Sequence, residues 1–201
     1  MKIRMTFTEP VLGTLSGNKE IAEEFIISKH PDGHCEEESE AVPEEALEKA
    51  STGFSRTDGK PHLWNYQIEG FFKEACAAMV HMGAITKEEL KRVRLTEYLY
   101  KKTIDEAIFV SPRKIFLDLP NGDELAFCER PLRGQTMRGE RIALARSEMA
   151  PAGTTIEVEI ATLNPKLTDF VKRWLDYGSL KGIGQWRNSG MGRFSWELIS
   201  E

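Results

Sequence analysis

Residues 167–199 read LTDFVKRWLDYGSLKGIGQWRNSGMGRFSWELI, a stretch that predicts a helix, a glycine-rich loop and a closing β-strand. The first part has apolar residues at the spacing of one helix face: Leu167, Phe170, Val171, Trp174 and Leu175. We expect this helix to begin at Asn164 and Pro165 and to end at Gly178. Residues 194–199 are expected to form the strand that follows the loop.

The segment between the helix and the strand combines glycines with hydrogen-bond donors. Four glycines fall within eleven residues: Gly182, Gly184, Gly190 and Gly192. Six donor side chains interleave with them: Lys181, Gln185, Arg187, Asn188, Ser189 and Arg193. Glycine allows positive φ and a close approach of the backbone, and phosphate oxygens accept bonds from backbone N–H groups and from basic side chains. The segment therefore predicts a site for a polyanion, and the alternative is a long turn between a helix and an edge strand.

The charge of the chain is divided unevenly along its length. Residues 19–50 hold eleven acids and three lysines, a net charge of −8, which leaves +3 for the rest of a chain whose net charge is −5. Residues 130–146 carry +4, as do residues 166–193. Two local basic stretches favour a confined polyanion site over a wholly basic face, although a solvated surface explains either stretch by itself. The acidic segment could mimic nucleic acid or dock onto a basic partner.

The remaining periodicities predict an α+β chain. Expected strands cover 2–8, 104–119, 124–128, 141–146 and 154–163, expected helices cover 69–82 and 86–100, and the hairpin signal lies at 120–123. The second helix begins with a capping box of Thr86 and Glu89, and a break near Thr96 is the alternative to a continuous helix. The segment 51–60 is expected to be a loop. The order of these elements predicts a ferredoxin-like (RRM-like) βαββαβ fold. We expect a single domain over 1–201 with an acidic, helical insertion at about 19–60.

Several function classes are excluded by the sequence. No apolar run is long enough to cross a membrane, and the N-terminus lacks the apolar core of a signal peptide, so a cytoplasmic protein without a membrane partner is expected. Three dispersed cysteines predict no disulfide framework. The phosphate-binding signature of nucleotide hydrolases is absent, and the glycine-rich segment follows a helix instead of opening one, unlike a dinucleotide site. We expect no cofactor and no metal, because His30, His34 and Cys35 form only a weak ligand set.

Three segments resemble motifs of the RAMP superfamily of CRISPR-associated RNA-binding proteins, in the chain order of that family. Residues 182–194 (GIGQWRNSGMGRF) resemble its C-terminal loop, G-G-G-x-x-x-x-G-x-G-x-hydrophobic, with Ile183 interrupting the first glycines. Residues 148–160 (EMAPAGTTIEVEI) resemble its E-x-x-x-x-G-T-x-F-x-x-x-I strand pair, and residues 68–75 (IEGFFKEA) resemble its helix entry, I-P-G-S-S-L-K-G-A. The chain also resembles uncharacterised phage and prophage proteins of this kind.

The resemblance implies a single-stranded RNA-binding or nucleic-acid-binding protein of phage or CRISPR context, assembling with Cas-like protein subunits or as a homo-oligomer. Two alternatives remain open: a metal-independent endoribonuclease acting through His62 or His81, and a protein–protein assembly or CRISPR-antagonising phage protein. Non-enzymatic binding is favoured, and no catalytic residue is assigned. Trp186 is expected either to stack on an unpaired base or to cover the core. The predicted nucleic-acid-binding residues are Lys73, Arg133, Arg138, Lys181, Gly182, Gly184, Gln185, Trp186, Arg187, Asn188, Gly190, Gly192 and Arg193.

Overall fold

The computed structural model describes residues 1–16, 52–95, 99–122, 124–136 and 139–200, without the side chains of residues 121, 132–136 and 139–143. The strands are β1 (Lys2–Phe7), β2 (Val11–Leu12), β3 (Leu15–Ser16), β4 (Thr52–Gly53), β5 (Ser55–Thr57), β6 (Lys60–Trp64), β7 (Ile108–Ser111), β8 (Lys114–Phe116), β9 (Ala126–Thr136), β10 (Gly139–Ala150), β11 (Thr155–Thr162) and β12 (Phe194–Ser200). The helices are α4 (Asn65–His81), α5 (Lys87–Arg92), α6 (Tyr100–Ala107) and α7 (Lys166–Lys181), with 3₁₀ turns η1 (Pro120–Gly122) and η2 (Arg187–Ser189).

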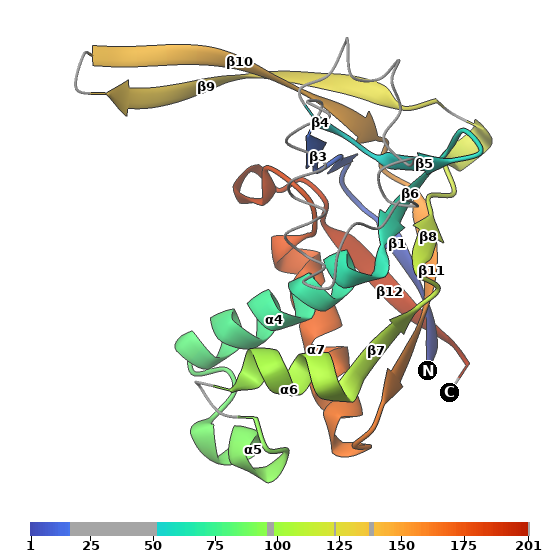
Figure 1. The fold of residues 1–201 in the computed structure, drawn as a ribbon, viewed down its shortest axis with the longest axis vertical. Helices are drawn as coiled ribbons and strands as arrows, with labels where there is room; N and C mark the ends of the chain where they lie inside the picture. The colour runs from blue at the N-terminus through green and yellow to red at the C-terminus, as the bar shows by residue number, and fades with distance from the viewer. Residues whose placement is uncertain (17–51, 96–98, 123, 137–138, 201) are drawn as a thin grey trace, which may run out of the picture.

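The main sheet has the strand order β12-β1-β11-β7, and each neighbouring pair is antiparallel. The helix α4 follows β1 along the chain, and α7 joins β11 to β12, so β1, α4, β7, β11, α7 and β12 form a βαββαβ unit. Both helices lie on the same side of the sheet (Figure 1). The predicted α+β, ferredoxin-like fold is confirmed.

The core lies between the main sheet and the helices α4 and α7. Inward residues of β1 and β11 alternate with exposed ones, as expected for strands with one covered face. Trp174 of α7 is fully buried, and its ring centroid lies 5.9 Å from that of Phe72 on α4. Phe194 of β12 packs edge-on against Phe7 and Phe71, at centroid distances of 6.2 and 5.6 Å. The helical stripe of residues 167–175 therefore packs as the sequence predicts.

The segment 104–107 is helical, which corrects the predicted strand over 104–119. The β-branched Thr103 and Ile104 favour an extended backbone, but Tyr100, Ile104 and Ala107 have the spacing of one helix face. Ile104 is fully buried, while Tyr100 and Ala107 pack against the core as half-buried side chains. Strand β7 begins only at Ile108. Tertiary packing of three residues therefore outweighs the local preference.

The helix predicted over 86–100 is not continuous, in line with the alternative of a break near Thr96, since α5 ends at Arg92 and α6 starts at Tyr100. Its predicted N-terminal capping box is confirmed. The Thr86 hydroxyl accepts a bond from the Glu89 N–H at 3.2 Å, and the Glu89 carboxylate accepts one from the Thr86 N–H at 2.8 Å. These bonds from Thr86 hold the pKa of Glu89 below its usual value, with the Arg173 guanidinium adding to the effect.

The helix α7 continues through Gly178 and ends at Lys181, three residues later than predicted. Gly178 lies under the ring of Phe194, where a Cβ atom would come 2.0 Å from the Cζ atom of that ring. Because Gly178 has no side chain, α7 can pack closely on β12 at this position, and the helix does not end there. The helix terminates at Gly182, whose φ of 77° no longer fits a right-handed helix.

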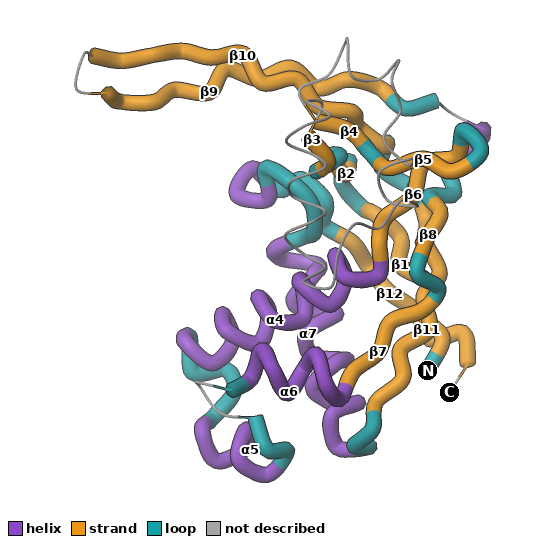
Figure 2. Tube along the Cα trace, viewed as in Figure 1, coloured by secondary structure: helices purple, strands orange, loops and turns teal. Residues whose placement is uncertain are grey.

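Strands β9 and β10 form a hairpin much longer than the predicted strands 124–128 and 141–146, and it extends away from the rest of the molecule (Figures 1 and 2). At its base, β10 pairs with β2 in antiparallel and with β4 in parallel orientation. Among the described residues, its outer part pairs within the hairpin alone, with Arg133 opposite Ile142. The sequence predicts shorter strands because Pro131 and Gly134 interrupt the period-two pattern of β9.

The segment 52–57, predicted as a loop, forms β4 and β5. The three-stranded sheet β5-β6-β8 adjoins the hairpin base. Glu148 on β10 is 2% exposed and accepts bonds from the Phe54 N–H at 2.9 Å and from both terminal nitrogens of Arg56 at 3.1 and 2.6 Å. This carboxylate ties β10 to β5, and no local sequence pattern marks it.

The acidic segment 19–50 lies entirely outside the described residues, so the predicted insertion and the single domain stay predictions. The same holds for the ligand set of His30, His34 and Cys35. Among the helices that the structure describes, none is both long enough and apolar enough to span a membrane.

Candidate nucleic-acid interface

The glycine-rich loop, defined here as residues 182–193, connects α7 to β12 and is held at its base by backbone hydrogen bonds. The Ile183 N–H donates to the Gly192 carbonyl at 2.9 Å, which closes the loop on itself. The Gly192 N–H donates to Pro10 at 2.8 Å, and the Thr8 N–H donates to Arg193 at 2.8 Å. These bonds fasten the loop to the segment between β1 and β2.

Three of the four glycines approach protein backbone instead of open space. A Cβ atom added to Gly192 would lie 1.9 Å from the Ile183 carbonyl oxygen. One added to Gly182 would lie 2.6 Å from the Gly192 carbonyl carbon, and one added to Gly184 would lie 3.0 Å from the Leu12 carbonyl oxygen. Gly190 differs, because a Cβ atom there would meet the Arg193 guanidinium first, at 3.5 Å. All four have φ between 71° and 88°. Packing and backbone conformation thus explain the glycines, and a role for them in binding stays a prediction.

Trp186 is the residue of the loop with the least usual combination of properties. Its backbone adopts the left-handed conformation, with φ 55° and ψ 31°. Residues other than glycine, asparagine and aspartate rarely adopt this conformation. Its indole is 40% exposed, and the Arg130 guanidinium carbon lies 5.1 Å from the ring centroid. The ring therefore does not fold into the core. Strained residues of this kind cluster at ligand sites, which makes Trp186 the leading candidate for a ligand contact.

Arg130 joins the hairpin to the glycine-rich loop. It lies on β9 close to the base of the hairpin, is 8% exposed, and donates to the Gln185 side-chain oxygen at 2.9 Å and to the Ser147 hydroxyl at 3.3 Å. The two basic stretches of the sequence therefore meet at Arg130. Sequence reasoning counted Arg130 in the basic stretch and did not select it, because strand periodicity gave no signal that it would be buried.

The other basic residues of the loop make individual contacts. Arg187 pairs with Glu74 of α4, and the Lys181 ammonium donates to the Asn188 side-chain oxygen at 2.8 Å. Arg193 is exposed beside Gly190. Of the predicted site residues, Trp186, Asn188 and Arg193 are exposed, whereas Gly182 and Gly192 are buried. The loop contacts α4 through Arg187 and the hairpin base through Gln185.

A groove separates the glycine-rich loop from α4 and has a volume of about 510 Å³. Its floor is apolar, and its rim is polar, with Thr14, Gln67, Glu74 and Arg187 among the lining residues. Gly184 and Gly70 also line it, so the predicted helix-entry segment and the predicted loop segment, more than a hundred residues apart in sequence, face each other there. Binding grooves in proteins commonly combine an apolar floor with a few polar groups of this kind.

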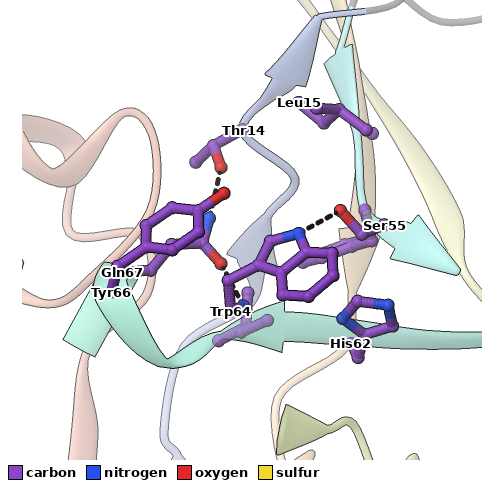
Figure 3. A pocket seen from close by; sticks show the side chains of 10 residues that line it. Thr14, Leu15, Ser55, His62, Trp64, Tyr66 and Gln67 are labelled. Atoms are coloured by element: carbon purple, nitrogen blue, oxygen red, sulfur yellow. Dashed lines mark hydrogen bonds between the residues drawn. The ribbon is translucent and has the colours of Figure 1, made fainter. Parts of the chain in front are cut away.

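A smaller cavity adjoins the groove at the start of α4 (Figure 3). Gln67 organises it: its side-chain oxygen accepts from the Trp64 N–H at 2.8 Å, and its amide donates to the Thr14 hydroxyl at 2.7 Å. The Trp64 indole donates to the Ser55 hydroxyl at 2.8 Å. With a volume of about 20 Å³, this cavity admits little more than water, so the larger groove is the candidate ligand site.

The structure places Lys73 away from the loop, in an ion pair with Asp105 of α6. Glu69 lies one turn earlier on α4, and burial raises the pKa of its carboxyl. Lys73 therefore sits in a helix–helix contact, and its predicted phosphate contact requires that pair to open. Arg138 and the side chain of Arg133 lie outside the described residues, so their predicted contacts stay predictions.

The two histidines considered for catalysis have different surroundings. His62 is 1% exposed and packs edge-on between Trp64 and Phe116, at centroid distances of 4.7 and 5.7 Å. Its Nε2 atom lies 3.2 Å from the Thr57 hydroxyl oxygen. A ring so enclosed has no path to a 2′-hydroxyl group. His81 is exposed at the last position of α4, two turns beyond Glu74, which pairs with Arg187 of the loop.

The open face of the main sheet, away from α4 and α7, is not basic. Glu157 on β11 pairs with Lys2 at 2.8 Å and with Arg4 at 2.7 Å, and Arg4 also pairs with Glu197 at 3.0 Å. Hydrogen bonds from Lys2 and Arg4 hold the pKa of Glu157 below its usual value. The cations of this face are occupied by carboxylates, which leaves the glycine-rich loop as the better candidate interface.

Comparisons with known proteins give a likeness in structure. No protein-family profile and no curated protein sequence matches the chain. A chain from the cryo-EM structure of the type III-B Cmr-beta bound to cognate target RNA matches 99% of this chain with a TM-score of 0.54 and 10% sequence identity. This chain spans 58% of that chain's length. The likeness shows a shared fold.

A second solved structure, that of Cmr6 from Pyrococcus furiosus, matches 98% of this chain and 97% of its own length, with a TM-score of 0.48 and 11% identity.

Proposed function

We propose that this chain binds single-stranded RNA across the surface formed by the glycine-rich loop, as a RAMP-like subunit of a CRISPR ribonucleoprotein or of a phage assembly. The observation that carries the proposal is Trp186, held in a left-handed conformation with 40% of its indole exposed, next to a groove lined by Arg187. An exposed indole offers a stacking surface for an unpaired base, and neighbouring cations neutralise phosphates. The RNA bound to the Cmr-beta of like fold supports the same ligand class.

Single strands suit this surface better than duplexes. The main-sheet face is occupied by ion pairs, and the candidate surface consists of a groove and the exposed ring of Trp186, which directly precedes the groove residue Arg187. Bases in a duplex are stacked on each other and cannot stack on Trp186 as well. The resemblance to the RAMP superfamily and the RNA-bound structural neighbour favour RNA over DNA. The binding test therefore compares single-stranded RNA with single-stranded DNA.

A salt titration of binding tests the proposal. We expect a labelled single-stranded RNA to be retarded in a gel at low salt, and the logarithm of its association constant to fall linearly with the logarithm of the salt concentration, with a slope of about −0.7 per phosphate contacted. A duplex of the same sequence and a single-stranded DNA serve as controls. Absence of binding at low salt, or binding unaffected by salt, contradicts the proposal. Incubation in EDTA shows in the same experiment whether the RNA is cleaved without metal.

Replacement of Trp186 by glycine separates strain from recognition. Glycine adopts φ 55° without penalty, so Trp186→Gly is expected to leave the free energy of unfolding within about 1 kcal/mol of the parent. The same change removes the stacking surface and should weaken single-stranded RNA binding by about tenfold. Trp186→Phe keeps a smaller ring and serves as the control. Equal affinities of the glycine and phenylalanine variants would mean that no base stacks on this residue.

A second function, assembly through protein contacts, is favoured by the β9–β10 hairpin that extends from the body (Figure 1). Leu144 on β10 is among its exposed apolar residues. Mass measurement in solution with and without RNA distinguishes the two: a homo-oligomer formed without RNA supports assembly, and a mass that grows only with RNA supports binding.

A further inference from the structure

Arg130 differs from the other guanidinium groups at this end of the molecule. Arg56 is paired with Glu148, Arg187 with Glu74 and Arg146 with Glu129. Arg130 is more deeply buried than these, yet no ion pair joins it to a carboxylate within the part of the chain that the structure describes. Its Nε atom is buried and has no hydrogen-bond partner there. A buried cation that lacks a counter-ion is costly, which indicates that an anion is missing from the described state.

The neutral group that contacts Arg130 from the loop is the side chain of Gln185. Its amide oxygen accepts from the Nη2 atom of Arg130 at 2.9 Å. The only other acceptor bonded to the guanidinium among the described residues is the Ser147 hydroxyl, at 3.3 Å. An anionic oxygen in the place of the amide oxygen would form a charge-assisted bond, which is roughly twice as strong as a neutral one.

The position of Gln185 links this contact to the proposed stacking surface. Gln185 directly precedes Trp186, whose ring lies over Arg130. Gln185 is half-buried on a loop, so its side chain can leave by rotation without disturbing the backbone bonds at Ile183 and Gly192. A nucleotide stacked on Trp186 therefore passes beside the Gln185 side chain, whose oxygen accepts from the Nη2 atom of Arg130.

We propose that Arg130 is an anion site, in which Gln185 occupies the place of a phosphate oxygen and gives it up to a phosphodiester of the bound strand. The inference rests on the proposed function, because the phosphodiester belongs to the single-stranded RNA bound at the loop. To that function it adds Arg130 as a binding residue and a phosphodiester as the group bound. It also adds the replacement of the Gln185 side-chain oxygen by a phosphate oxygen. It also assigns the contact to Arg130, which the resemblance to the RAMP loop does not include.

Two substitutions of Gln185, one that adds a negative charge and one that removes the side-chain amide, test whether Arg130 is an anion site. Gln185→Glu places a carboxylate beside Arg130 and satisfies it internally, whereas Gln185→Ala leaves the guanidinium open. We expect Gln185→Glu to raise the unfolding temperature without ligand, to weaken single-stranded RNA binding by about tenfold, and to reduce the salt slope by about 0.7, the value for one phosphate. Gln185→Ala should keep the salt slope of the parent, because the guanidinium of Arg130 stays open to a phosphate.

Arg130→Gln is expected to reproduce the lower salt slope, and Arg146→Gln is the matched control on the same hairpin, since Arg146 is already paired with Glu129. The probe is a 5′-hydroxyl single-stranded RNA, whose phosphates are all phosphodiesters. Equal affinities and slopes for Gln185→Glu and Gln185→Ala overturn the inference, even if both bind RNA. Should Arg130→Gln fail to fold, the comparison of Gln185→Glu with Gln185→Ala still tests whether Arg130 binds a phosphate.

Inorganic phosphate, added at constant ionic strength, separates failure of this inference from failure of the proposed function. If the parent protein does not bind RNA, the proposed function is wrong. A larger rise of the unfolding temperature with phosphate in the parent than in Gln185→Glu would then still support an anion site at Arg130. An equal rise in both proteins overturns that site.

Discussion

Gly192→Ala is expected to destabilise the protein more than any other single alanine in the glycine-rich loop. The new Cβ atom would lie 1.9 Å from the Ile183 carbonyl oxygen, and the backbone has a φ of 71°. The left-handed conformation costs about 1–2 kcal/mol for a residue with a side chain, and displacement of the backbone adds about 1–3 kcal/mol. We expect a loss of about 3 kcal/mol in the free energy of unfolding, measured by urea denaturation.

Gly190→Ala is the matched control for this prediction. Its φ of 88° imposes a similar backbone penalty, but its nearest neighbour is the flexible end of Arg193, at 3.5 Å. The loss should therefore be about 1 kcal/mol. RNA binding should also suffer more in Gly192→Ala, because the backbone bond between Ile183 and Gly192 fixes the position of Trp186. Equal losses of stability in the two variants would show that the close approach is not maintained in solution.

Glu148→Ala is expected to produce a loss of similar size at the hairpin base. Removal of this carboxylate leaves the Phe54 N–H and the Arg56 guanidinium without their acceptor. Breaking a buried ion pair from one side costs about 3–5 kcal/mol, and the 21% exposure of the Arg56 side chain places the expectation at about 3 kcal/mol. Thermal or urea unfolding measures the change.

Glu129→Ala removes an exposed carboxylate from the same hairpin, where Glu129 lies 3.3 Å from Arg146. It should change the free energy of unfolding by less than about 1 kcal/mol. The double variant Arg56→Ala, Glu148→Ala should be less destabilised than the sum of its single variants, because neither charge is then left alone. A Glu148→Ala variant as stable as Glu129→Ala would contradict the structural role of the buried pair.

The prediction of the candidate site was only partly possible from the sequence. Glycine and donor spacing selected residues 181–193; within this segment the structure exposes Trp186, Asn188 and Arg193 and buries Gly182 and Gly192. The sequence did not select Arg130, whose burial depends on the approach of Gln185 and Trp186 from a segment fifty-five residues away. It also placed Lys73 at the phosphate site, whereas the contact between α4 and α6 directs that side chain to Asp105.

The sequence by itself determined the βαββαβ order, because the stripe of residues 167–175 and the alternation of 155–160 are local periodicities that the burial of one face imposes. Only the tertiary structure decided the helix at 104–107, the position of Gly178 inside α7 and the long β9–β10 hairpin. These features depend on which surfaces meet: Ile104 with the core, Gly178 with the ring of Phe194, and Arg130 with the loop. Contacts between distant segments carry no periodic signal along the chain, so they emerge only when the chain is folded.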